Sequence, residues 1–218
     1  MKKITLALFT VLAALSLNAQ TFEEGRIVSK ITYPDFDNPG ILAMLPKEMV
    51  TYFKGDKTCI EQPGAMGKTI IISDAKKKET KVYMPTGGAV ITKTDAEVKS
   101  ETARENEATV TVTTETKVIA GYTCKKATVK YKDGEEGEIW FCPELTRPAS
   151  ASWNKPYPSI TGMVMEYTVI KQTQIGELVM VMTVTEVSKE AVDKTRFDAP
   201  PGKWKAMTME EYMKAMGQ

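Results

Sequence analysis

Short runs of alternating or continuous apolar residues, rich in Val, Ile, Thr and Tyr, recur along almost the whole chain. Gly, Pro, Asn and Asp stand between them, and this combination is typical of β-strands joined by turns. The connections are too short for crossovers between parallel strands, so we expect a mostly antiparallel sheet. The predicted strands are 26–33, 49–54, 68–72, 80–84, 89–92, 109–118, 126–131, 138–141, 163–170 and 178–187.

Two segments depart from this pattern and predict helices. Asn38-Pro39-Gly40 precedes five apolar residues, Ile41 to Leu45, and Pro46 ends the run, which indicates one short helix. Near the C-terminus, Thr208 and Glu211 have the spacing of a capping box. Methionines and a tyrosine follow at helical spacing, namely Met209, Tyr212, Met213 and Met216. Such a stripe is more often part of a core than a binding face.

The first nineteen residues have the pattern of a secretory signal peptide. Lys2 and Lys3 precede an apolar run at 4–17, and Ala19 provides a small residue for cleavage. The run is shorter than the ~20 apolar residues of a membrane-spanning helix, and no Cys follows the cleavage point to carry a lipoprotein anchor. We therefore expect a single secreted β-rich domain at 20–218, periplasmic or extracellular, without a membrane span.

Composition excludes several function classes. The 218 residues contain no His, which removes Ser-His-Asp and Cys-His catalysis and every metal site that needs imidazole. Loss of Lys2 and Lys3 with the signal peptide leaves 27 basic groups against 28 acidic ones, a formal charge of −1. That balance does not favour a nucleic-acid-binding face. We expect a protein that is not an enzyme, with no cofactor, no metal and no nucleic-acid partner.

Local strings that resemble motifs fail on their spacing. The string 64–69 ends like a phosphate-binding loop, but it lacks the first glycine and continues as a strand. The string 35–40 begins like a calcium loop, but Pro46 stands where the bidentate carboxylate belongs. The acidic residues around Asp133-Gly134 are expected to form a solvated turn.

The three cysteines allow a prediction about pairing. A hairpin folded about Asp133 places Ala127 opposite Ile139 and Cys124 opposite Cys142. An oxidising compartment would keep a disulfide between such neighbours, and we predict one between Cys124 and Cys142 with Cys59 unpaired. The alternative is a bond from Cys59 to one of the other two.

An apolar surplus suggests a ligand pocket. In 163–165 and 178–182 both alternating faces are apolar, so these strands should be covered on both sides. Methionine and aromatic side chains around a curved sheet suit an adaptable apolar pocket, whereas the alternative is a closed, filled core. The candidate ligand-binding residues are Leu42, Met44, Leu45, Trp153, Tyr157, Ile160, Met163, Met165, Met180 and Met182.

Several of these stretches resemble known families. The run 118–129, with Gly121-Tyr122-Thr123-Cys124-Lys125-Lys126, and the segments 139–141 and 153–158 resemble uncharacterised secreted proteins of Bacteroidota. These are the GLPGLI family and the related domain of unknown function numbered four-four-one-two. The GLPGLI string is absent, which favours the second family. The strand pattern at 50–57, 70–74 and 81–84 and the ending 196–204 are similar to LolA-like lipoprotein carriers.

The resemblance implies a curved, open antiparallel sheet, a LolA-like half-barrel, with the short helix at Ile41 to Leu45 plugging its concave side. It implies no catalytic residues. A non-enzymatic binding protein that shelters a lipid or lipoprotein acyl chain, or another apolar ligand, follows by analogy of fold. The alternative is an envelope interaction protein with a filled core and a protein partner at a sheet edge or an exposed loop.

Overall fold

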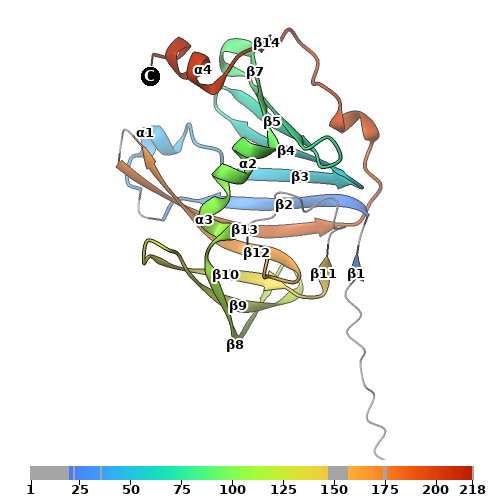
Figure 1. The fold of residues 1–218 in the computed structure, drawn as a ribbon, viewed down its shortest axis with the longest axis vertical. Helices are drawn as coiled ribbons and strands as arrows, with labels where there is room; N and C mark the ends of the chain where they lie inside the picture. Colours follow the sequence, from blue (N-terminus) through green and yellow to red (C-terminus); the bar gives the residue numbers. More distant parts are fainter. Residues whose placement is uncertain (1–19, 22, 35, 147–156, 174–175, 218) are drawn as a thin grey trace, which may run out of the picture.

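The computed structural model describes residues 20–21, 23–34, 36–146, 157–173 and 176–217. Its main element is a twelve-stranded sheet in the order β14-β7-β6-β5-β4-β3-β2-β13-β12-β10-β9-β8 (Figure 1). The strands are β2 (Glu24–Thr32), β3 (Glu48–Lys54), β4 (Lys57–Gly64), β5 (Gly67–Asp74), β6 (Glu79–Met84), β7 (Ala89–Lys93), β8 (Thr109–Ile119), β9 (Tyr122–Lys130), β10 (Glu136–Cys142), β12 (Met163–Thr173), β13 (Gly176–Ser188) and β14 (Lys205–Ala206). Two short strands, β1 (Gln20–Thr21) and β11 (Leu145–Thr146), pair separately.

All ten predicted strands are confirmed, and one further long strand was missed. β4 lies between β3 and β5 although Pro63 and Gly64 read as a turn in the sequence. β3 pairs with β4 only as far as Glu61. Pro63 therefore has a paired strand, β5, on one side only, and its missing N–H removes no hydrogen bond to β3.

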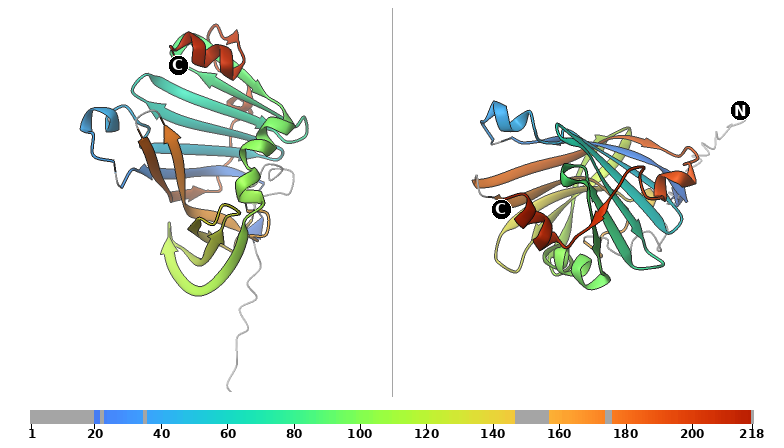
Figure 2. Two further views of the ribbon diagram at one scale, coloured as in Figure 1. Left: turned by 60° about the vertical axis from the view of Figure 1, so that its left-hand side comes forward. Right: turned by 90° about the horizontal axis from the view of Figure 1, so that it is seen from above.

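The sheet is antiparallel, as predicted, except that β14 runs parallel to β7. It curves strongly and does not close, because β14 and β8 lie at its two ends without meeting (Figure 2). The expected curved, open antiparallel sheet is therefore confirmed.

The described residues include four short α-helices beside the sheet. α1 (Pro39–Leu42) is capped by Asn38, whose Oδ1 accepts a bond from the Ile41 N–H at 3.1 Å. α4 (Met209–Ala215) begins at Thr208 with the predicted capping box. α2 (Asp95–Glu101) and α3 (Ala103–Asn106) were not predicted. Two 3₁₀ turns, η1 (Thr86–Gly88) and η3 (Lys194–Phe197), complete the helical elements of the described residues.

The two helices that were not predicted, α2 and α3, connect distant strands of the sheet. β7 and β8 are consecutive in the sequence but lie ten places apart in the sheet order. α2 and α3 join them and lie across the concave side of the curved sheet (Figure 2). We call α2 and α3 the bridging helices. α1, which was expected to plug the concave side, lies instead beyond the strand ends, away from the bridging helices (Figure 1).

The core is divided into several clusters of buried side chains. The largest surrounds Phe53 and Met165, which are fully buried. A second surrounds Ile139, and smaller ones lie under α4 and under η3. The apolar side chains are therefore buried in several places along the twelve-stranded sheet and not at one centre.

The β9–β10 hairpin has the predicted register. Ala127 lies opposite Ile139, and the ladder runs as far as Phe141 opposite Lys125. One more step puts Cys142 opposite Cys124; both side chains are buried in the same cluster, and all three cysteines are free thiols in this structure. The register that motivates the disulfide is therefore confirmed, and the bond itself stays a prediction.

The predicted signal peptide at 1–19 lies outside the described residues. None of the helices that the structure describes is long and apolar enough to cross a lipid bilayer.

Candidate functional site

The predicted ligand-binding residues that the structure describes belong to different parts of the molecule. Tyr157 and Ile160 are buried in the cluster around Ile139, whereas Met163 and Met165 belong to the cluster around Phe53. Their surfaces are covered by neighbouring side chains, as in a filled core.

The remaining predicted residues are spread further. Met182 is buried and Met180 is half-buried on β13. Leu42 and Leu45 are half-buried at α1, while Met44 is exposed beside them. Trp153 lies outside the described residues.

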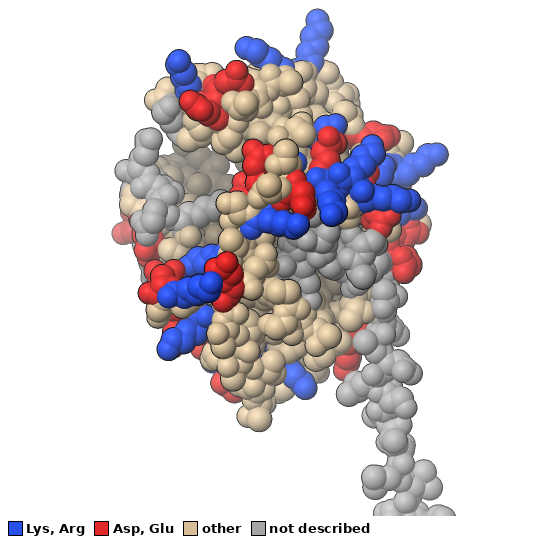
Figure 3. Space-filling model, viewed as in Figure 1, with Lys and Arg blue, Asp and Glu red and all other residues tan. Residues whose placement is uncertain are grey.

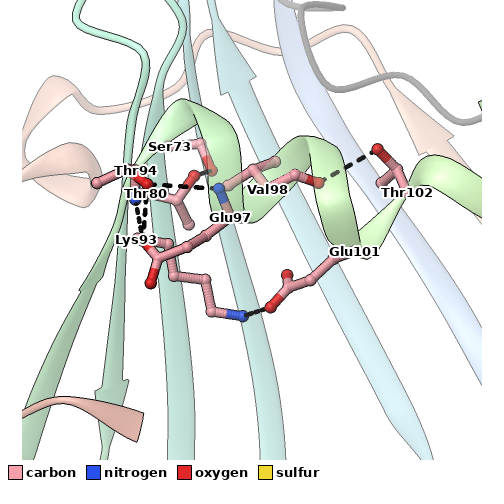
Figure 4. A network of polar contacts seen from close by, with 8 residues as sticks. All are labelled: Ser73, Thr80, Lys93, Thr94, Glu97, Val98, Glu101 and Thr102. Atoms are coloured by element: carbon pink, nitrogen blue, oxygen red, sulfur yellow. Dashed lines mark hydrogen bonds and ion pairs between the residues drawn. The ribbon is translucent and has the colours of Figure 1, made fainter.

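The bridging helices are held to the first half of the sheet by α2. Val98 is the buried side chain of this helix. Thr94 caps it: the Glu97 N–H donates to Thr94 Oγ1 at 3.3 Å, and the Thr94 N–H donates to Glu97 Oε2 at 2.7 Å (Figure 4). The Lys93 ammonium binds the Glu101 carboxylate at 2.5 Å, and this ion pair joins the end of β7 to the last residue of α2.

A buried polar pair lies on the sheet beneath α2. Ser73 Oγ of β5 and Thr80 Oγ1 of β6 are 2.9 Å apart in a hydrogen bond (Figure 4). Because each hydroxyl satisfies the other, neither is a free polar group that would require a ligand.

The second half of the sheet holds the other bridging helix, α3. Arg104 Nε donates to Asp133 Oδ2 at 3.0 Å in the turn after β9, and the same guanidinium also binds Glu135. It lies over the Tyr131 ring, 3.8 Å from the ring centroid. The acidic turn is exposed to solvent, as expected, and it also has a cation from its own chain as partner.

A cleft opens between α2, β7 and the C-terminal segment. It encloses about 570 Å³, within the range of small-molecule sites. Figure 3 shows a hollow on this face between α4 and the charged side chains over α2. The apolar lining comes from Val90, Ile91, Ala206, Met207 and Met209, and the polar lining from Thr92, Lys93, Glu97, Ser100, Glu101, Thr208 and Glu211.

The charge of this lining is negative. The backbone N–H and hydroxyl of Thr94 hold the pKa of Glu97 below its ordinary value, and Thr208 does the same for Glu211. With Glu101 these carboxylates outnumber the single ammonium, Lys93, by three to one. The cleft should favour an uncharged or cationic polar group over an anionic one.

Sequence reasoning missed this cleft because it missed α2. The signal was present: Thr94 and Glu97 have the same capping-box spacing that identified α4. Among the described residues, no group of three Cys, Asp or Glu side chains has the arrangement of a metal site.

Comparison with protein families gives one match. The model described as "Domain of unknown function (DUF4412)" matches residues 24–151. No curated protein matches the chain at a significant level.

Comparison with solved structures finds similar chains at low sequence identity, two of them with TM-scores of 0.50 or above. PNGF-II is 14% identical over 90% of this chain, with a TM-score of 0.51, and the chain spans 34% of that protein's length. An uncharacterised conserved protein from Thermus thermophilus is 7% identical, with a TM-score of 0.50, over 85% of this chain and 90% of its own. The Pseudomonas aeruginosa MucA/MucB complex contains a chain 11% identical over 81% of this chain and 56% of its own, with a TM-score of 0.44.

Proposed function

The chain belongs to the DUF4412 family of domains of unknown function, and from the geometry of its cleft we propose that it is a non-enzymatic binding protein for an apolar ligand. The single observation that carries the proposal is the cleft of about 570 Å³ between α2, β7 and α4. Its apolar lining comes from β7 and the segment that leads to α4, and its polar lining from α2, the end of β7 and the first turn of α4.

The chemistry of the lining selects the ligand class. Val90 and Met207 offer apolar contacts, and the unbranched thioether of Met207 adapts to ligands of different shape. The surplus of carboxylates disfavours a free fatty acid, because its carboxylate would meet like charges. An acyl chain that ends in an ester, an amide or an amine fits better, and this includes a lipid or a lipoprotein acyl chain.

The cellular location belongs to the same proposal. The signal-peptide pattern of residues 1–19 supports export to the periplasm or beyond the cell. There a protein with an apolar cleft would meet lipids and lipoproteins of the envelope.

Native mass spectrometry with lipid extraction tests the proposal on mature protein purified gently from its own envelope. Ser100→Trp would fill the cleft from an exposed position on α2. Ala96→Trp, also exposed on α2 but outside the cleft lining, is the matched control. We expect a co-purifying acyl species that Ser100→Trp removes and Ala96→Trp retains. An empty protein that also fails to take up a fluorescent acyl ester would contradict the proposal.

The residues predicted from sequence at α1, Leu42, Met44 and Leu45, are a second possible location for the same ligand. Leu45→Ala tests it, because Leu45 lies outside the cleft lining. If ligand is lost in Leu45→Ala and kept in Ser100→Trp, the ligand binds near α1 and not in the cleft.

A second candidate function is an envelope interaction protein that binds a partner at β8. This eleven-residue strand ends the sheet, and among the described residues β9 is the only strand that pairs with it. Val112 and Val118 are exposed on it, so it offers both free backbone groups and apolar side chains to an added strand. A photo-crosslinker at Val118 should capture one specific envelope protein, and a crosslinker at Val28 of the central strand β2 serves as control.

A further inference from the structure

The ligand cleft runs along the edge of β7. Its lining includes four consecutive residues of this strand, from Val90 to Lys93. Successive side chains of a strand point to opposite faces of a sheet, so no single face presents all four residues, whereas the edge of the strand does. The backbone of β7 therefore borders the cleft.

This edge is paired over only part of its length. β6 pairs with the whole of β7 on one side, while β14 on the other side pairs with Ala89 and Val90 alone. The Met207 N–H adds a bond of 3.1 Å to the Val90 carbonyl, and the chain then turns into α4 at Thr208. Backbone groups alternate in direction along a strand, so the N–H and C=O of Thr92 point the same way as those of Val90. No strand of the described residues pairs with Thr92 on this side.

The walls beside this edge carry negative charge. Glu97 belongs to α2 and Glu211 to α4, and both line the cleft. The ammonium of Lys93 is paired with Glu101, and within the described residues neither Glu97 nor Glu211 forms an ion pair. A cationic group on a ligand would be attracted to these two carboxylates.

α4 is a fixed wall with an apolar side chain at the cleft. Tyr212 is its buried residue and belongs to the core cluster under this helix. Met209 lines the cleft and is 41% exposed, and Met213 and Met216 are exposed as well. The expectation that the methionine stripe is part of the core therefore holds for Tyr212 and is wrong for these three methionines.

Unpaired backbone at a strand edge binds another extended chain as an added strand. We propose that the ligand is an N-acyl peptide with a basic side chain, and that its backbone pairs with Thr92 at the outer edge of β7. Its acyl chain lies against Val90 and Met207, and its basic side chain lies near Glu97 and Glu211. This inference rests on the proposed function and adds to it the chemistry of the polar end of the ligand.

Isothermal titration calorimetry of the full mature chain tests the inference with three probes. They are N-octanoyl-Ala-Lys-Ala-amide, the same peptide with methylated backbone nitrogens, and methyl octanoate. We expect the first probe to bind about tenfold more tightly than either of the others, because only its backbone can donate hydrogen bonds to the strand edge. Replacing the lysine of the probe by glutamate should weaken binding as well, because the new carboxylate meets like charges.

The key variant is Thr92→Pro, which removes the outward N–H and leaves the pairing with β6 intact, an arrangement that strand edges tolerate. Thr92→Ala keeps the N–H and is the matched control. We expect Thr92→Pro to lose about tenfold in affinity for the acyl peptide and to keep its affinity for methyl octanoate, while Thr92→Ala keeps both. Melting curves show whether each variant is folded.

The outcomes separate this inference from the proposed function. Equal binding of the acyl peptide and its N-methylated form would overturn the inference and leave the proposed function standing. Equal affinity of wild type and folded Thr92→Pro for the acyl peptide would overturn it too, since the peptide would then bind elsewhere. Failure of all three probes to bind would overturn both. If Thr92→Pro does not fold, the N-methylated probe decides.

Discussion

Arg104 of α3 binds Asp133 in the turn between β9 and β10, with 3.0 Å between Nε and Oδ2. The two residues are 29 positions apart and belong to different layers: one to a bridging helix, the other to the sheet. Together with the contact to Glu135 and the Tyr131 ring, this ion pair holds the far end of the bridging helices to the second half of the sheet.

Arg104→Gln should loosen the bridging helices without unfolding the sheet, because the guanidinium is their main polar contact to the hairpin. We expect faster amide hydrogen exchange over residues 95–106 and little change in β2 and β13. Lys99→Gln, which removes only the exposed pair with Asp95 inside α2, is the control. Equal exchange in both variants would show that the ion pair does not hold α3.

The same contact predicts a dependence on acid. The Glu135 N–H and the Arg104 guanidinium hold the pKa of Asp133 below its ordinary 3.8. A carboxyl whose pKa is lowered by folding stabilises the folded state above its unfolded pKa, and this stability is lost as the pH falls through the folded value. Melting curves from pH 7 to pH 2 should therefore show the wild type above Asp133→Asn at neutral pH and the two converging below about pH 4. A constant difference across this range would contradict the assignment, and Asp37→Asn, exposed in another segment, is the control.

Thiol titration tests the disulfide between Cys124 and Cys142. We expect one thiol in the denatured, exported protein and three after reduction; three before reduction would end the prediction. In the folded protein, burial raises the pKa of Cys59 to about 11, so this thiol should react slowly with a thiolate-selective reagent at pH 8.

Stability measurements distinguish core from ligand contact among the predicted pocket residues. Met165 is fully buried, so Met165→Ala should lower the free energy of unfolding by about 2–5 kcal/mol through the cavity it leaves. Met44→Ala, at an exposed methionine, should stay within about 0.5 kcal/mol of wild type. Denaturant unfolding without ligand checks both. A small effect of Met165→Ala would show that the space around Met165 is not a tightly packed core.

Part of the site was readable in the sequence and part was not. The capping box at Thr94 and Glu97 is a local signal, equal in kind to the one that identified α4. Nothing local indicates that α2 lies across from the segment before α4, since Glu97 and Met207 meet at the cleft only through the folded sheet. The exposed state of Met213 was equally hidden, because helical periodicity gives a shared face but not what that face meets.

The sequence by itself determined the local structure: ten strands, the helix at Thr208 and the register that sets Ala127 opposite Ile139. These follow from alternation of side chains, turn residues and capping groups, all of which act within a few positions of the chain. The tertiary structure alone decided that β13 lies beside β2, that the bridging helices cross the concave side, and that Arg104 meets Asp133. Such contacts join residues far apart in sequence, and which of many compatible partners is chosen depends on how the whole sheet curves and buries its apolar faces.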